Sequence, residues 1–316
     1  MFHWIDWTVS ESGQGYFAAT MRLAVPLLLA ALGGVYCERA GVVNVGLEGM
    51  MLSGALSASL VASGTGSAVA GLFAGVATGI LVAALLAVFT VVLPCDPVVS
   101  GISLNLLAVG GTTFAFRAVV GTGGTSHPSP TIGATPVPGL RDIPVLGPLL
   151  FDQTYLVYVA LAAVVVTRVV LRRTGWGLLI RACGEHPAAA DSVGLDVNRT
   201  RFVCLLVSGG LAGLGGVFVS LVSSSQFVEN MTAGRGYIAL AILILGRRSA
   251  FGVLAASLLF GLGDAFQLRA QLSHSGIPFE FLLMIPYVLT MLMPAVFGRR
   301  LYTPAALGVP FRRGQR

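Results

Sequence analysis

The sequence predicts an all-α, polytopic membrane protein, a bundle of about nine transmembrane helices within a range of eight to ten. Of its 316 residues, 55% are hydrophobic and only 10% are charged. Soluble globular proteins carry roughly 25% charged residues, so this composition cannot supply a soluble surface. Apolar runs also recur at close to the length of about 20 residues that a helix needs to cross the hydrocarbon core. The same composition excludes a disordered chain and a disulfide scaffold.

The expected spans are the nine apolar runs along the chain. They lie at 16–35, 42–63, 68–93, 98–121, 153–171, 202–224, 226–246, 250–268 and 280–298. The seventh run differs from the others, because only 237–246 is continuously apolar and the preceding QFVENMTAGRG is polar. Irregular backbone at membrane depth is tolerated only where protein covers it or where it lines a cavity. We therefore expect a broken or re-entrant helix at 226–246.

The arginines predict the orientation of the chain. All nineteen basic residues are arginine, and most of them gather in the loop 172–201, at 247–248 and in the tail 299–316. Basic loops stay in the cytoplasm, and an odd number of spans places all three clusters there. We expect residues 1–316 to form one transmembrane domain. Its N-terminus and the Pro/Gly-rich loop 122–152 would then lie outside, and its C-terminus in the cytoplasm.

Small residues at four-residue spacing predict two packing faces. Gly71, Gly75 and Gly79 recur on the third run, and Gly209 and Gly213 recur on the sixth. Lipid supplies no hydrophobic drive for helix association, so small residues that let backbones approach closely mark the contact. These glycines predict tight helix packing and carry no information about a substrate.

No constellation of catalytic or metal-binding residues is visible. Without lysine the chain cannot carry a G-x-x-x-x-G-K-[ST] phosphate loop, and its four cysteines show no C-x-x-C spacing. We therefore expect no enzymatic activity, no metal site and no cofactor in this chain. Nucleic-acid binding is not expected either, because the arginine placement follows membrane topology.

Polar residues inside the apolar runs are the candidates for function. Asn44 and Glu48 lie at the start of the second run and Asn105 lies in the fourth. Such residues are costly in a bilayer and usually face the bundle interior or a cavity. Two structural alternatives stay open: an ion pair of Glu48 with Arg39, and an interhelical hydrogen bond from Asn105.

The loop 172–201 contains a short expected helix from Pro187 to about Val193. Proline suits the first turn of a helix, and Gly194 follows as a stop signal. A short helix that projects from a membrane bundle requires a partner to bind it.

Three segments resemble the permease subunits of ATP-binding-cassette (ABC) importers of the branched-chain amino acid, ribose and nucleoside type. They are ERAGVVNVGLEGMM (38–51), GEHPAAADSVGLDVNRTR (184–201) and MTAGRGYIALAILILGRRSAFG (231–252). Near the end, FGLGDAFQLRAQ and IPFEFLLMIPYVLTMLMPAVFGRR are similar to the nucleoside and simple-sugar branch. The resemblance covers about residues 16–300, in the family's order.

The resemblance implies a coupling segment and a set of partners. A separate ATPase, which binds ATP and Mg²⁺, would dock on the 172–201 loop. The coupling residues would be Gly184, Glu185, Ala188, Ala189, Asp191 and Gly194. A second permease subunit, in a heterodimer rather than a homodimer, and an extracytoplasmic substrate-binding lipoprotein complete the complex in a bacterial inner membrane.

Nucleosides are the cargo that the resemblance favours. They need hydrogen-bonding groups and an aromatic or apolar platform, so the candidate lining residues are Asn44, Glu48, Asn105, Phe114 and Gln226. Ribose and other simple sugars, or branched-chain amino acids, are the alternatives within the same importer class. A secondary transporter that works alone would need an intramembrane ion relay, and the sequence shows none.

Overall fold

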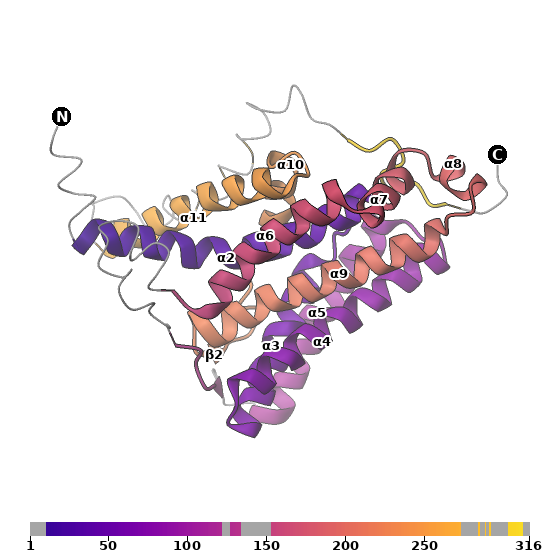
Figure 1. The fold of residues 1–316 in the computed structure, drawn as a ribbon. Helices are drawn as coiled ribbons and strands as arrows, with labels where there is room; N and C mark the ends of the chain where they lie inside the picture. The colour runs from indigo at the N-terminus through magenta and orange to yellow at the C-terminus, as the bar shows by residue number, and fades with distance from the viewer. Residues whose placement is uncertain are drawn as a thin grey trace, which may run out of the picture.

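The computed structural model describes residues 11–121, 127–133, 153–272 and 303–311, together with Met284, Val288 and Met291. This part of the chain is a helical bundle with one two-stranded sheet, β1–β2 (Figure 1). Its elements in chain order are α2 (Glu11–Arg39), α3 (Leu47–Thr65), α4 (Ala68–Ala87), η1 (Val88–Val92), α5 (Pro97–Val120), β1 (His127–Pro128), α6 (Tyr155–Arg173), α7 (Gly175–Glu185), α8 (Pro187–Ser192), α9 (Val197–Val217), η3 (Phe218–Ser223), β2 (Gln226–Phe227), α10 (Arg235–Leu245) and α11 (Ala250–Leu272).

Six helical segments in the described residues are long and apolar enough to cross a membrane. They contain α2, α4, α5, α6, α9 and α11. The expected second run corresponds to α3, which has 19 residues but is less apolar, and the seventh corresponds to α10, with 11 residues. The ninth run, 280–298, lies almost wholly outside the described residues. The chain is therefore a multi-pass membrane protein, with six spans in the part described.

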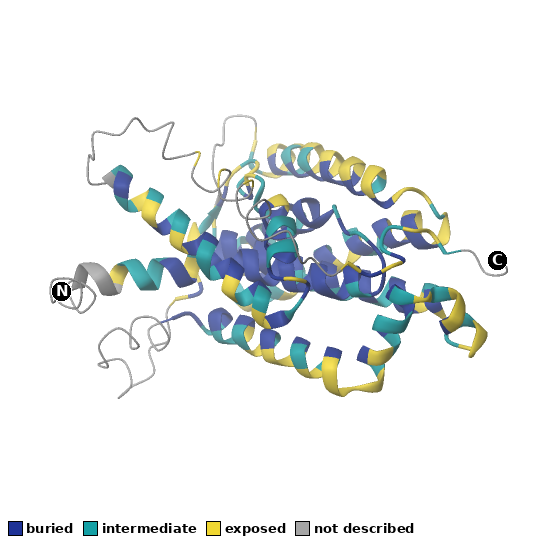
Figure 2. Cartoon of the chain, turned by 90° about the horizontal axis from the view of Figure 1, so that it is seen from above, coloured by how far each residue is buried: buried dark blue, intermediate teal, exposed yellow. Residues whose placement is uncertain are grey.

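Helix α2 forms the centre of the bundle. Of its most apolar stretch 78% is buried, against 22% for α5. It packs against α9, α10 and α11, and dark blue buried residues surround it in Figure 2. Neighbouring helices, rather than lipid, therefore cover most of the apolar surface of α2.

Large apolar side chains remain exposed on the outer helices. They belong mainly to α4, α5, α6 and α11, and include Phe73, Leu81, Leu106, Leu107, Phe114, Val165, Val166 and Phe266. Contiguous apolar surface of this kind marks contact with lipid or with another subunit.

Glycines bring α4 and α9 into backbone contact. A Cβ added to Gly79 would lie 2.3 Å from the Gly209 carbonyl oxygen, and one added to Gly213 would lie 2.7 Å from the Gly75 oxygen. Real Cβ atoms do not approach this closely, so larger residues would push the helices apart. The two helices therefore meet along the glycine rows.

Helix α3 packs between α4 and α9 in the same way. A Cβ on Gly71 of α4 would lie 2.5 Å from the Ala58 oxygen, and one on Gly216 of α9 would lie 2.0 Å from the Met51 oxygen. Three helices are thus held at close range, with dispersion contacts and no side-chain ion pair among them in the described residues.

The 172–201 segment contains one more helix than the sequence predicted. Helix α8, Pro187–Ser192, lies where the short helix was expected, but α7, Gly175–Glu185, precedes it. The first turn of α7 contains Gly175 and Gly177, and glycine disfavours a helix, so the sequence indicated a loop there. Gly177 is required there, because a Cβ at this position would lie 2.1 Å from the Val170 oxygen where α7 folds back on α6.

Candidate functional site

The starts of two helices meet in the interior of the bundle. Helix α3 begins at Leu47 after the non-helical residues 40–46, and α10 begins at Arg235 after the turns of 228–234. A Cβ added to Gly236 would lie 2.3 Å from the Glu48 backbone nitrogen, so only glycine permits this contact. The expected interruption of the seventh run is present, and the start of α3 adjoins it.

The buried carboxylate of Glu48 caps the start of α10. Its Oε1 accepts hydrogen bonds from the Thr232 hydroxyl at 2.6 Å and from the Gly234 N–H at 2.9 Å, and its Oε2 accepts from the Gly236 N–H at 2.6 Å. The first N–H groups of a helix lack partners within the helix and carry a partial positive charge. At a surface, water would accept the hydrogen bonds of these N–H groups. Here the Glu48 carboxylate accepts them, and its negative charge also interacts favourably with the start of α10.

Asn44 closes the turn before α3. Its Oδ1 accepts a hydrogen bond from the Gly46 N–H at 3.0 Å, and its Nδ2 donates to the Ser208 hydroxyl of α9 at 2.8 Å. Both groups are buried. The side chain thus satisfies a non-helical backbone group and links it to a neighbouring helix.

Asn105 performs the same task from α5. Its Oδ1 accepts a hydrogen bond from the Gly49 N–H at 2.9 Å, and its Nδ2 donates to the Val45 carbonyl and to the Tyr237 hydroxyl, each at 2.9 Å. Three helices, α3, α5 and α10, are joined through this one amide. The interhelical alternative considered for Asn105 is therefore present in the structure.

The structure thus brings three of the five candidate lining residues together and separates the other two. Asn44, Glu48 and Asn105 surround the junction of α3 with α10, and Glu48 pairs with Thr232 and backbone N–H groups rather than with Arg39. Phe114 lies on α5 with 76% of its surface exposed. Gln226 lies in β2, opposite Pro128 of β1.

An open groove of about 320 Å³ lies between α3, α4 and α5. Its walls are mainly apolar, with Leu104 and Leu107 of α5 among them. The polar groups are hydroxyls; those of Ser57 and Thr112 donate to backbone carbonyls. Phe114 lies two turns beyond Leu107 on the same face of α5. The groove therefore offers apolar surface with a few hydroxyls, next to an exposed aromatic ring.

The segment 172–201, to which the resemblance assigns coupling and which is called the coupling segment below, has a buried and an exposed side. Gly184 is buried, and a Cβ there would lie 2.2 Å from the Arg39 carbonyl oxygen. Ala190 packs with Cys183 and Val197 in a small core of its own. Glycine at 184 thus lets α7 press against the end of α2, and α8 is fixed in place by Ala190.

The exposed side of this segment includes several small and apolar residues among its polar ones. Ala188, Ala189 and Gly194 are exposed, and Asp191 is half-buried. Two further residues, which the sequence analysis did not single out, are Leu178 and Val193, with 62% and 74% of their surface exposed. The sequence signal that could have identified Leu178 and Val193 was the presence of apolar residues within a charged loop.

Residues 303–311 also lie at this end of the molecule. The sequence analysis treated them only as part of a basic tail. The Ala306 N–H donates to the Gly184 carbonyl and the Gly308 N–H donates to the Gly41 carbonyl, each at 3.0 Å. The buried Arg201 donates to the Val309 carbonyl at 2.9 Å. Residues 303–311 are therefore hydrogen-bonded to α7, to the turn after α2 and to α9.

In the last turn of α5, Arg117 forms a bidentate ion pair with Glu229, with N–O distances of 2.7 and 3.0 Å. The hydrogen bond from Arg117 lowers the pKa of Glu229 below its ordinary value of 4.5. This stabilisation is present above the ordinary pKa and is lost as the pH falls through the lowered one. We expect Glu229→Gln to lower the thermal midpoint slightly at pH 7 and by less at pH 3. An equal difference at both pH values would contradict this role.

Comparison with known proteins decides the family. The model of a family described as branched-chain amino acid transport system / permease component matches residues 16–294. This chain belongs to that permease family. The permease is 37% identical over 308 residues to the guanosine ABC transporter permease protein NupQ of Bacillus subtilis, with 94% of this chain and 96% of NupQ covered. It is 38% identical to the nucleoside ABC transporter permease protein NupC of Lactococcus lactis, with 91% and 93% covered.

A relative of similar identity is named for a different substrate. The putative glucose ABC transporter permease protein TsgC13 of Haloferax volcanii is 39% identical over 259 residues, which is 81% of this chain and 78% of that protein. No solved structure matches the permease. The resemblance found from sequence motifs is therefore confirmed at the level of the family.

Proposed function

We propose that this chain is the permease subunit of an ABC importer that carries nucleosides across a bacterial inner membrane. The observation that supports this most is the 37% identity to the guanosine permease NupQ over 94% of the chain. The groove between α3, α4 and α5 fits the same cargo. Its apolar walls and the nearby Phe114 ring suit a nucleobase, and its hydroxyls suit a ribose.

Transport would be driven by a separate ATPase that docks on α7 and α8. ATP and Mg²⁺ belong to that partner, since this chain has no phosphate loop, and this chain then contributes no catalytic group. Exposed Val193 and Leu178, with Ala188 and Ala189 between them in sequence, provide an apolar contact surface, and Glu185 and Asp191 provide charges that set its register. Movement of this segment would pass through Gly184 to the end of α2.

The rest of the complex follows from the importer class. A second, different permease subunit would face this one across the groove, and a substrate-binding lipoprotein would deliver the nucleoside from outside. The three arginine clusters support a cytoplasmic position for α7 and α8 and an external N-terminus.

Uptake of labelled guanosine, uridine, adenosine, ribose and glucose by cells with and without this gene tests the proposal. Loss of nucleoside uptake alone, restored by the intact chain, supports the nucleoside assignment. Loss of sugar uptake instead would keep the importer class and replace the cargo. Unchanged uptake of every compound would contradict the assignment of cargo.

The docking surface is tested by Val193→Asp. We expect nucleoside uptake to fall at least about tenfold, because a buried interface contact of this size is worth roughly 1.5–3 kcal/mol and the new carboxylate would be desolvated. The matched control is Ser192→Asp, which adds the same charge one residue away without removing an apolar side chain. Co-purification of the ATPase with each variant provides the direct measurement. Equal retention of the ATPase by Val193→Asp and the intact chain would contradict docking at this position.

A further inference from the structure

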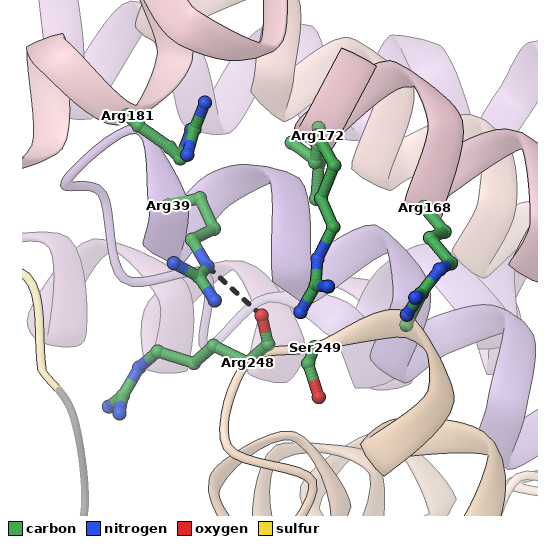
Figure 3. Close-up of a pocket in the computed structure, with 8 residues that line it drawn as sticks. Arg39, Arg168, Arg172, Arg181, Arg248 and Ser249 are labelled. Atoms are coloured by element: carbon green, nitrogen blue, oxygen red, sulfur yellow. Dashed lines mark hydrogen bonds between the residues drawn. The ribbon is translucent and has the colours of Figure 1, made fainter.

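A cavity of about 390 Å³ is lined chiefly by arginine (Figure 3). Arginine side chains reach it from the end of α2, the last turns of α6, the helix α7 and the turn between α10 and α11. They belong to Arg39, Arg168, Arg172, Arg181 and Arg248. Figure 3 shows the side chains of the first four arranged around one space, with the Arg248 guanidinium turned away from it.

In the part of the chain that the structure describes, carboxylates near this cavity are recorded as acting on two of the five arginines. Glu38 forms a buried ion pair with Arg248. Glu185 lies close enough to Arg39 for its charge to act on that guanidinium, whose Nε donates to the Arg248 carbonyl at 3.0 Å. One positive charge is thus neutralised inside the protein and a second is partly balanced.

The other three arginines have no carboxylate partner among the described residues. The Arg181 Nε donates to the Gly177 carbonyl at 3.3 Å, and Arg168 stacks on the Phe251 ring with 4.5 Å from guanidinium carbon to ring centroid. Arg172 makes no hydrogen bond to any residue that the structure describes. Most of the donor capacity of these three guanidiniums therefore remains available to a ligand.

Such a cluster is costly without a counter-charge. Guanidiniums that line one cavity repel each other, because the charges are only partly screened at a protein surface. A phosphate removes this repulsion and accepts the paired N–H bonds that guanidinium forms best. Helix α11 also begins at the cavity wall, at Ala250, and its N-terminal dipole adds attraction for an anion.

Apolar side chains adjoin the arginines on the membrane side. Val165, one turn before Arg168 on the same face of α6, has 54% of its surface exposed, and Phe251 of α11 has 47% exposed. Both helices are candidate spans that end or begin at the cavity. Charged donors next to an exposed apolar strip match a ligand with a phosphate head and acyl chains, whereas free phosphate would leave the strip unused.

We propose that this arginine pocket binds the phosphate of an anionic phospholipid. The phosphodiester lies among Arg168, Arg172 and Arg181, and the acyl chains lie along α6 and α11 beside Val165 and Phe251. The bound lipid would join α7, which carries the coupling segment, to α6 and α11 of the bundle.

Native mass spectrometry of the delipidated full-length chain in detergent tests the pocket. The probes are phosphatidylglycerol, zwitterionic phosphatidylcholine and inorganic phosphate. We expect phosphatidylglycerol to bind at least about tenfold more tightly than phosphatidylcholine, because each lost charged hydrogen bond costs about that factor. The double variant R168Q/R172Q should lose this preference. The control R173Q/R199Q removes two exposed arginines from the same end of the molecule and should keep it.

The remaining outcomes separate the sources of the phosphate. Tight binding of inorganic phosphate, lost in R168Q/R172Q, would support a phosphate pocket and assign it to a free anion instead of a lipid. Equal binding of both lipids, or equal losses in R168Q/R172Q and the control, would overturn the proposal. Should R168Q/R172Q fail to fold, Arg172→Gln alone provides the test, since that side chain makes no hydrogen bond to any described residue.

Discussion

Replacement of Glu48 by Gln is expected to destabilise the permease and to reduce uptake at least about tenfold. The carboxylate accepts three hydrogen bonds, two of them from the backbone N–H groups of Gly234 and Gly236. The Gln amide has one acceptor oxygen, and its NH₂ group would face one of these donors. An unsatisfied buried N–H costs about 1–3 kcal/mol, and the lost attraction between the charge and the start of α10 adds up to about 2 kcal/mol.

This loss is large against a total stability of about 5–15 kcal/mol. The substitution also affects a short helix. The 11 residues of α10 span about 16 Å, which is about half the thickness of the hydrocarbon core, so the start of α10 depends on protein groups for its hydrogen bonds. The thermal midpoint of the purified chain and uptake by cells are the measurements. Glu229→Gln is the control, because it removes the same charge from an exposed carboxylate. A Glu48→Gln protein as stable as the control variant would contradict the capping role.

Gly209→Ala and Gly210→Ala are expected to have opposite effects, although the two residues are neighbours on α9. A Cβ at Gly209 would lie 2.3 Å from the Ala83 Cβ and 2.4 Å from the Gly79 oxygen, whereas one at Gly210 would lie 3.4 Å from its nearest neighbour, in Ile80. The first variant must separate α4 from α9, at a cost of about 1–3 kcal/mol or more. The second gains up to about 1 kcal/mol from the better helix propensity of alanine.

The difference between these two thermal midpoints measures the glycine contact directly. Because helix propensity acts equally at both positions, any gap between the variants reports the approach of α4 to α9. Equal midpoints would mean that the helices have room to adjust and that the close contact contributes little to stability.

The periodic features of the fold could be predicted from the sequence. Apolar runs located the long helices, and the polar stretch before Tyr237 located the interruption that precedes α10. The four-residue glycine spacing identified packing faces on α4 and α9, because this signal depends only on local geometry. That these two faces meet each other is known only from the structure. Helix α7 was missed, since Gly175 and Gly177 oppose a helix locally, and the contact with α6 that requires Gly177 is visible only in the structure.

The partners in the candidate site could not be predicted, because they are distant in sequence and mostly backbone. The sequence identified Glu48 as a costly polar residue, but its acceptors serve N–H groups nearly 190 positions later. Asn105 likewise serves the N–H of Gly49 and the hydroxyl of Tyr237. Residues 303–311 gave no periodic signal at all, and their place under the coupling segment follows from backbone hydrogen bonds that any sequence could form.

The contact of residues 303–311 with the coupling segment has a consequence for biosynthesis. The Ala305 N–H contacts Glu185 across 120 residues of chain. At about 5–20 residues per second, a ribosome needs roughly 6–24 s to make that stretch after the coupling segment has emerged. During this interval the proposed ATPase-docking end lacks residues 303–311. Only chains translated past residue 311 can present the finished surface, so assembly with the ATPase would discriminate against prematurely terminated permeases without any dedicated quality-control factor.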